Sequence, residues 1–402
     1  MSDSSSSTDS GAPVSAEGSD PAPAAAEAAA GSSPNRLLGA HMPTAGGLHK
    51  SLLAGKEITC SAVQLFTGSP RQWSHPPLQD EEVAAFHAAR EATGIAFTVA
   101  HDSYLINLAA PSADVLERSC KAFRGELDRA NRLGIPWVVT HMGAHLDQGE
   151  EAAVQRLVEN LKRILDDTEA EGYTAGIALE TTAGQGTGLG YRFEQLAEVL
   201  AGVGPHPRLG VCLDTCHVFA AGYDLRDEAS YRQTWRAFDA LIGYDKLKVI
   251  HANDSKKPLG SRVDRHEHIG EGEIGIEAFA RLVTDPKLLH VPIIIETPDS
   301  ETMHAVNLAR LKRLAAGGAL GMNVTVYLFG HFSDIFGAEP QEVSLPTGAT
   351  ARDLAALLAQ RDPRLAALTT HCRCAVNEEY AEMDTVLTEG CEVAFIPPMS
   401  GG

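Results

Sequence analysis

The sequence predicts an α/β fold: a (β/α)8 barrel over residues 35–316, followed by a small α+β domain over residues 322–402. Two observations support the barrel. From residue 36 to about residue 316, short apolar runs alternate with amphipathic stretches, a pattern typical of parallel strands covered by helices on both faces. Eight such units in about 280 residues match the strand number and size of a closed barrel.

The individual elements follow from this alternation. Each near-continuous apolar run is expected to be a buried strand, and each longer amphipathic stretch a helix. The expected strands are 36–41, 60–66, 96–101, 137–141, 176–180, 208–214, 247–251 and 292–296. The clearest expected helices are 80–93, 112–133, 150–171 and 301–316.

A different pattern begins after a glycine-rich linker at residues 317–321. Its first strand starts with Met322, as a separate reading frame would. The order β-β-α-β-β within about 80 residues fits a β-grasp, ubiquitin-like domain. The expected strands are 322–330, 341–346, 372–377 and 391–398, and the expected helix is 350–361.

Composition restricts the cellular setting. Residues 1–34 are rich in Ser, Ala, Pro and acidic residues, so this tail is expected to be disordered because it buries too little apolar surface. No run approaches eighteen apolar residues, and the N-terminus lacks the features of a secretory signal, so neither a membrane span nor secretion is expected. Seven cysteines, scattered and mostly inside apolar runs, indicate buried thiols in a reducing cytoplasm.

The charge distribution narrows the choice of partners. A net charge of −20 by itself argues against binding to nucleic acid. Residues 1–34 hold five acidic side chains and no basic ones, and residues 322–402 hold eleven acidic residues and four arginines. The long middle of the chain therefore carries only −8. Any contact with DNA must come from local basic loops on the barrel.

Charged and imidazole side chains end nearly all the barrel strands. Because the carboxyl ends of parallel barrel strands surround one mouth, side chains at those ends face a common cavity. The loop "RVDRHEHIGEGEIG" (262–275) follows the seventh strand on the same rim, so Asp264 and His266 are expected to reach in. Seven of the eight runs end in such a residue: His41, His101, His141, Glu180, Asp214, His251 and Glu296.

This set of donors predicts a metal centre. Imidazole combined with carboxylate suits zinc, manganese or iron, whereas an all-oxygen set would suit magnesium or calcium. Nine donors exceed the four that one zinc ion takes, so they would serve two or three ions. The donors at strand ends or just beyond are His101, His141, Glu180, Asp214, His217, His251, Asp264, His266 and Glu296.

Five longer motifs resemble the signatures of the endonuclease IV family, whose members are metal-dependent apurinic/apyrimidinic endonucleases on a TIM barrel. The resemblance covers residues 36–316. The motifs are "HDSYLINLA" (101–109), "LETTAGQGTGLG" (179–190), "CLDTCHVFAAGYD" (212–224), "NDSKKPLGSRVDRHEHIGEGEIG" (253–275) and "IIIETP" (293–298).

The resemblance implies a centre of three zinc ions, with Mn2+ as an alternative metal, and all nine ligand positions are filled. Glu180, shared by two ions, and Glu296, which would orient the attacking water, are the implied catalytic carboxylates. His41, His145 and His268 match no ligand position and are expected near the centre. The implied ligand sets are, in order, His101, His141 and Glu180; Glu180, Asp214, His251 and Glu296; and His217, Asp264 and His266.

The same resemblance implies a reaction. The enzyme would hydrolyse the phosphodiester 5′ to an abasic site in double-stranded DNA, leaving 3′-hydroxyl and 5′-deoxyribose-phosphate ends, as base excision repair requires. The barrel is expected to act as a monomer. The segments "PRQW" (70–73) and "HDSYL" (101–105) resemble the loops that this family inserts into DNA, and a basic cluster lies on the same rim. Together they predict DNA contacts by Arg71, Tyr104, Leu105, Lys256, Lys257, Arg262 and Arg265.

Residues 322–402, which end in "FIPPMSGG", resemble the small sulfur-carrying subunit of molybdopterin synthase. The related carrier of the thiamine pathway shares the Gly401–Gly402 tail, but the longer ending favours molybdopterin. The resemblance implies that an activating enzyme adenylates Gly402, that a thiocarboxylate replaces the adenylate, and that the tail enters the large subunit of the synthase. A glycine tail suits a narrow channel because it has no Cβ. The alternative is an inert appendage left by fusion of adjacent genes.

Two other functions remain open at this point. A sugar isomerase or epimerase on the same barrel would resemble this chain only in Glu180, Asp214, His251 and Glu296. Such an enzyme has no evident use for His101, His141, His217, Asp264 and His266 together, which favours the nuclease. The other alternative is a sulfur carrier or scaffold whose barrel is incidental, and a complete set of metal donors argues against it.

Overall fold

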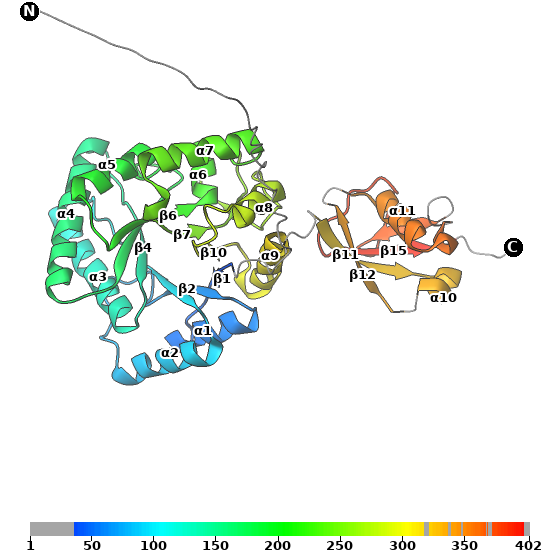
Figure 1. The fold of residues 1–402 in the computed structure, drawn as a ribbon, viewed down its shortest axis with the longest axis horizontal. Helices are drawn as coiled ribbons and strands as arrows, with labels where there is room; N and C mark the ends of the chain where they lie inside the picture. The colour runs from blue at the N-terminus through cyan, green and yellow to red at the C-terminus, as the bar shows by residue number, and fades with distance from the viewer. Residues whose placement is uncertain are drawn as a thin grey trace, which may run out of the picture. The chain divides into compact units, whose positions relative to one another are not determined.

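The computed structural model describes residues 36–316, 321–336, 339–346, 349–366, 368 and 372–397. The predicted tail at 1–34 and residues 317–320 of the predicted linker lie outside these ranges. Eight parallel strands close into a barrel in the order β1-β10-β7-β6-β5-β4-β3-β2, which confirms the predicted fold class (Figure 1). The strands are β1 (Leu38–His41), β2 (Ala62–Phe66), β3 (Phe97–His101), β4 (Trp137–His141), β5 (Gly176–Glu180), β6 (Leu209–Asp214), β7 (Leu247–His251) and β10 (Ile293–Ile295).

Helices surround this barrel (Figure 1). The four helices predicted from amphipathic periodicity correspond to α2, α3, α4 and α9, with ends within one residue of the predicted ones. Among the described residues, no helix is both long enough and apolar enough to cross a membrane. The helices are α1 (Leu48–Glu57), α2 (Asp80–Thr93), α3 (Ala113–Arg132), α4 (Glu150–Ala170), α5 (Phe193–Val203), α6 (Thr215–Ala221), α7 (Glu228–Leu241), α8 (Ile276–Thr284) and α9 (Ser300–Ala315).

The barrel interior holds an apolar layer, and its position shows which side chains at the strand ends point inward. One fully buried side chain from each of seven strands joins a single apolar cluster: Ala62, Val99, Val139, Ala178, Cys212, Val249 and Ile294. Side chains two positions apart on a strand share a face. The next inward residues toward the carboxyl ends are therefore Gln64, His101, His141, Glu180, Asp214, His251 and Glu296. Because alternate residues of a strand face the interior, the apolar layer is followed, toward the carboxyl ends of the strands, by a ring of polar side chains.

Gly39 allows two strands to approach each other. It pairs in register with Ala62, and a Cβ at Gly39 would overlap the backbone oxygen of Ala62. We therefore expect Gly39→Ala to destabilise the barrel by about 3 kcal/mol or more, because the strands must separate. Thermal unfolding followed by circular dichroism measures this effect.

Gly125, in the middle of α3, is the matched control. A Cβ there would meet no atom within 4 Å. Gly125→Ala should leave the barrel unchanged or stabilise it by about 0.5–1 kcal/mol, since alanine favours a helix interior over glycine. Equal melting temperatures for the two variants would contradict this account of Gly39.

The C-terminal domain forms its own mixed sheet. Its strands are β11 (Gly321–Leu328), β12 (Gln341–Pro346), β13 (Arg373–Val376), β14 (Glu379–Ala381) and β15 (Glu392–Ile396), in the order β12-β11-β15-β13-β14. The parallel β11–β15 pair and helix α11 (Ala351–Arg361) agree with the predicted β-grasp. Strand β14 escaped prediction because it has only three residues, reached through a tight turn at Asn377 and Glu378, both with positive φ.

Two short elements lie outside the barrel and its surrounding helices. β8 (Asp254–Ser255) and β9 (His266–Glu267) pair antiparallel in the segment that follows β7. Ser255 lies opposite His266 in this pair. The segment is thereby folded back, so that the predicted ligands Asp264 and His266 stand beside the end of β7.

Candidate metal centre

Glu180, at the end of β5, is the hub of the polar ring. It is fully buried. One carboxylate oxygen, Oε2, lies 3.2 Å from His101 Nε2 and 3.0 Å from His141 Nε2. The other, Oε1, lies 2.8 Å from His251 Nδ1. Glu180 therefore faces two groups of imidazoles with its two oxygens, as a carboxylate shared between two ions would.

Asp214 and Glu296 complete the second of these groups. His251 Nδ1 lies 3.3 Å from Glu296 Oε2 and 3.9 Å from Asp214 Oδ2. Asp214 ends β6 and also caps α6, since its side chain accepts the backbone N–H of His217 at 2.9 Å. This cap fixes where His217 leaves the first turn of α6.

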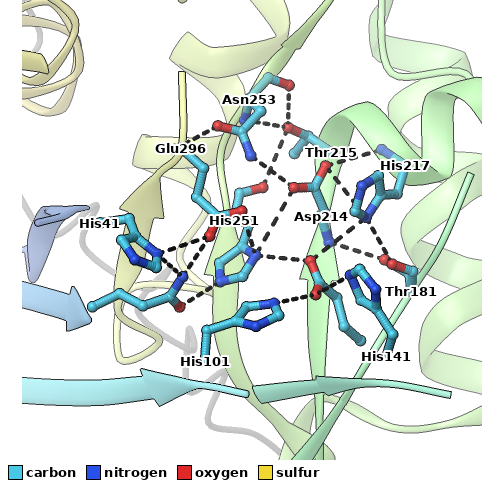
Figure 2. A network of polar contacts seen from close by, with 12 residues as sticks. His41, His101, His141, Thr181, Asp214, Thr215, His217, His251, Asn253 and Glu296 are labelled. Carbon is cyan, nitrogen blue, oxygen red and sulfur yellow. Dashed lines mark hydrogen bonds and ion pairs between the residues drawn. The ribbon is translucent and has the colours of Figure 1, made fainter. Parts of the chain in front are cut away.

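A third group forms around Asp264. Its two oxygens lie 3.2 Å from His217 Nε2 and 3.3 Å from His266 Nε2. His266 Nε2 also approaches Asp214 Oδ2, at 3.7 Å. Figure 2 shows His101, His141, His217 and His251 pointing toward one centre around Asp214 and Glu296. The side chains thus converge from the ends of five barrel strands, from the residue after β10, from α6, and from the segment that holds Asp264 and β9.

Hydrogen bonds fix which ring nitrogen faces the centre. A backbone carbonyl can only accept, so the nitrogen bonded to it carries the proton. The Nδ1 atoms of His101, His217 and His266 donate to the carbonyls of Asp102, Thr181 and Glu296, respectively, at 3.0, 2.8 and 3.1 Å. Each ring therefore presents Nε2 with its lone pair inward. His266 Nε2 is buried and makes no hydrogen bond with any of the described residues, so it suits a metal ion.

Charge balance also requires cations. Among the described residues, the ion-pair partners of the buried Glu180 and Asp214 are all histidines. Neutral imidazole does not compensate a buried carboxylate, and buried charges are normally paired or bound to metal. These residues therefore fit a cluster of cations.

The pKa shifts of these groups also indicate that the buried carboxylates need positive charge beside them. Burial opposes a charged imidazole, yet the hydrogen bond and charge of Glu180 raise the pKa of His101 to about 10. Burial likewise opposes charge on His266, while Asp214 and Asp264 raise its pKa to about 9. Burial alone would raise the pKa of Glu180, but the surrounding imidazoles, His251 first, hold it well below its usual range. Without metal, protons would have to supply the positive charge.

All nine predicted ligands thus lie around one centre. In each of the first two predicted sets, the ligand atoms lie within 4.8 Å of one another. His217 and His266 also form such a group with Asp214, as do Asp264 and His266 with the buried Cys216. Imidazole with carboxylate is the donor set that zinc, manganese and iron prefer.

The centre opens into two adjoining cavities of about 400 and 440 Å3. Both are lined by Tyr104, His141, His217 and Asp264. Tyr104 is 65% exposed although it stands beside the buried centre. A surface of this kind can receive an extended polymer across the barrel mouth.

Only some of the residues predicted to contact DNA lie at these two cavities. Tyr104, Leu105 and Arg265 line the cavities, and Arg71 is exposed and close enough to affect the pKa of Tyr104. The other three basic residues line neither cavity. Lys256 is paired with Glu267 at 3.1 Å, Lys257 is exposed, and Arg262 lies over the ring of Tyr191 at 4.6 Å.

Sequence reasoning missed two amides at the centre, Gln64 and Asn253. Gln64 is fully buried on β2 and contacts His41, His251 and Glu296. Asn253 donates to Asp214 Oδ2 at 2.7 Å and accepts the backbone N–H of Glu296 at 2.7 Å. A lone amide in the apolar run "AVQLF" was the available signal for Gln64.

The three histidines expected near the centre lie at different distances from it. His41 lines the cavity of about 400 Å3 and lies 3.3 Å from Glu296 Oε1. His268 faces Asn307 and Asp299 instead. His145 lines neither cavity, and its backbone N–H donates to Thr187.

One buried carboxylate organises the loop that carries Asp264 and His266. Asp254 accepts backbone N–H groups from Gly270, Gly272 and Ile274 at 2.9–3.1 Å. A Cβ at Gly272 would lie 2.5 Å from an Asp254 oxygen. The glycines of this loop are therefore explained by a tight wrap around Asp254.

Comparison with known proteins agrees with this geometry. Residues 52–314 match the family model described as "Xylose isomerase-like TIM barrel", and residues 326–402 match the ThiS family. A probable endonuclease 4 of Chloroflexus aggregans is 52% identical over 279 residues, which cover 69% of this chain and 97% of that protein. One from Geobacter sulfurreducens is 47% identical over 282 residues, covering 70% of this chain and 95% of that protein.

Solved structures give the same result. The crystal structure of endonuclease IV from Thermus thermophilus is 35% identical, with a TM-score of 0.63, and covers 70% of this chain and 100% of that one. A D-tagatose 3-epimerase-like protein is 19% identical, with a TM-score of 0.54 over 69% of this chain and 96% of that one, and shares the fold alone. With about half of the barrel residues identical over nearly the full length of its relatives, the chain belongs to the endonuclease IV family and carries a ThiS family domain at its C-terminus.

Proposed function

We propose that the barrel is a zinc-dependent apurinic/apyrimidinic endonuclease that hydrolyses the phosphodiester 5′ to abasic sites in double-stranded DNA, in the cytoplasm, for base excision repair. The products would be 3′-hydroxyl and 5′-deoxyribose-phosphate ends. The observation that supports this most is the convergence of five imidazoles and four carboxylates, from separate strands and loops, on one buried centre.

The residues around the centre would have different roles in this reaction. Bound metal ions supply a water with a pKa lowered toward ~7 and charge to neutralise the leaving oxygen. Glu180 holds the two imidazole groups at a fixed separation through its two oxygens. Glu296 lines the cavity of about 400 Å3, where its carboxylate can orient the attacking water. Asp214 and Asn253 hold the strand ends together from the side.

The activity is tested with a labelled duplex that carries one tetrahydrofuran residue, an abasic analogue without an aldehyde. This analogue cannot undergo elimination, so any cut requires hydrolysis. We expect a single cut 5′ to the analogue and a 3′ end that a polymerase extends, with an undamaged duplex left intact. An uncut analogue would contradict the proposal.

A sugar epimerase remains the competing function, since the shared fold extends to an epimerase-like protein. The nuclease and the epimerase differ in which side chains they need: the nuclease uses His101, His141, His217, Asp264 and His266 together, and an epimerase has no evident use for them. Only a third ion site uses His217, Asp264 and His266 together. Epimerisation of ketohexoses by a preparation that fails to cut the abasic duplex would favour the epimerase.

Tyr104 is the side chain best placed to contact the DNA stack. It is exposed, lines both cavities, and packs edge-on against Phe66. Stacking of a base on an aromatic ring contributes about 1–3 kcal/mol. Tyr104→Ala should therefore weaken binding to the abasic duplex roughly tenfold to hundredfold, measured by fluorescence anisotropy.

Tyr380, on β14 of the C-terminal domain, supplies the control. It is 73% exposed and lies outside the barrel. Tyr380→Ala should bind the abasic duplex as the wild-type protein does. Wild-type affinity in the Tyr104 variant would show that this ring does not contact the stack.

For the C-terminal domain, we propose a sulfur carrier that acts in molybdopterin synthesis through a thiocarboxylate on Gly402. The family match and the β-grasp sheet support a carrier-like domain. Gly401 and Gly402 themselves lie outside the described residues. The implied partners are an activating enzyme and the large subunit of molybdopterin synthase.

Intact-mass spectrometry tests this carrier role. The full chain is incubated with an activating enzyme, ATP and a sulfur donor, and we expect the mass to rise by the exchange of one oxygen for sulfur. A chain with Gly402 deleted should stay unmodified. No mass change in the full chain would leave the inert appendage as the better explanation.

A further inference from the structure

Gln64 occupies the position of the polar ring on β2, where none of the nine predicted metal ligands stands. It lies on β2, two residues beyond Ala62 of the apolar layer, and is fully buried. Its side-chain oxygen lies 2.7 Å from His251 Nε2. Its side-chain nitrogen lies 2.9 Å from His41 Nδ1 and donates to Glu296 Oε1. One amide therefore touches three side chains around the centre.

The contacts of this amide settle its orientation. An ionised carboxylate can only accept hydrogen bonds, so the NH2 group must face Glu296. The oxygen is then the atom that faces His251. Because an amide oxygen also only accepts, His251 Nε2 must carry a proton. The lone pair of a neutral His251 is thus placed on Nδ1, the atom that faces Glu180 and Glu296 at 2.8 and 3.3 Å.

His251 differs in this respect from the other histidines with fixed rings. His101, His217 and His266 are oriented by backbone carbonyls, which a side-chain substitution cannot remove. They present Nε2 to the centre, whereas His251 presents Nδ1. The orientation of His251 therefore depends on a single replaceable side chain. His251 is fully buried, so bulk water cannot take the place of that acceptor.

We propose that Gln64 is a positioning residue that sets the tautomer of His251 and holds Glu296, so that both can ligate the same ion. The inference rests on the metal centre of the proposed function. Groups that orient metal-bound histidines from behind are typically worth about 10- to 100-fold in metal affinity. Replacement of Gln64 should accordingly weaken the ion held by Glu180, Asp214, His251 and Glu296, and leave the other ions bound.

Gln64→Met tests this with little change in side-chain length. We expect one ion to be lost about 10- to 100-fold more readily in a chelator titration of the full chain, followed by elemental analysis. Gln195→Met is the matched control, because Gln195 is also a buried glutamine that bonds a backbone N–H and a carboxylate, on α5 away from the centre. It should lower the melting temperature without changing metal affinity.

Nitrogen-15 NMR of labelled histidine gives a second readout, independent of activity and of metal. We expect a slowly exchanging Nε2 proton on His251 in the wild type, its loss in Gln64→Met, and its retention in Gln195→Met, which leaves the Gln64 acceptor in place. Wild-type metal affinity in Gln64→Met, or an Nε2 proton on His251 that exchanges as slowly in Gln64→Met as in the wild type, would overturn the proposal. A wild-type chain that binds no metal would instead refute the metal centre itself.

Discussion

Glu180→Gln is expected to reduce incision of an abasic duplex by on the order of 10³-fold or more, while binding of the same duplex persists. The substitution keeps the shape of the side chain but removes the charge that His101, His141 and His251 share. The two imidazole groups then lose the carboxylate that links them. DNA affinity persists because Glu180 is fully buried and cannot touch the polymer. Single-turnover incision and anisotropy measure the two quantities separately.

Glu150→Gln provides the control for loss of a carboxylate. Glu150 begins α4 and bonds Tyr191, Arg192 and Gln195, away from the centre. This variant should cut the abasic duplex at the wild-type rate. Substantial incision by the Glu180 variant would mean that the centre does not depend on a shared carboxylate, and the proposed chemistry would fail.

Removal of metal should abolish incision completely and also loosen the barrel. The buried Glu180 and Asp214, and the partly buried Glu296, would lose the cations that balance them. A ligand present at 1,000 times its Kd stabilises the folded state by about 4 kcal/mol. For a domain of this size, that corresponds to a fall in melting temperature of roughly 10 °C. Differential scanning calorimetry before and after chelation measures the fall.

Restoration distinguishes loss of metal from damage to the protein. Zn2+ added to the stripped chain should recover both incision and melting temperature, and Mn2+ should substitute for it. Mg2+ should not, because it prefers an all-oxygen set of ligands. Full activity in a chain shown by elemental analysis to be free of metal would exclude a metal-dependent reaction.

Much of the fold and the centre was accessible from sequence because two simple periodicities control both. Apolar runs alternating with amphipathic stretches gave the barrel strands to within two residues. Strand ends at one mouth then brought His101, His141, Glu180, Asp214 and His251 together. These inferences hold because side chains on a barrel strand have few alternatives to facing in or out.

Other features could not be predicted because they depend on contacts between distant residues. Gln64 was overlooked because β2 runs two residues past the ring, to Phe66, so the end of the apolar run pointed to the wrong residue. The β8–β9 pair and the wrap of glycines around Asp254 depend on three-dimensional hydrogen bonds that leave no periodic signal. The ring nitrogens that face the centre likewise follow from neighbours rather than from spacing.

Elemental analysis of the chain as purified tests the metal centre most directly. The protein would be expressed in zinc-replete medium, desalted without chelator, and analysed by plasma mass spectrometry against protein concentration. The arrangement of three donor groups around Glu180, Asp214 and Asp264 predicts up to three transition-metal ions per chain, predominantly zinc. A chain that is folded and contains no transition metal would contradict it.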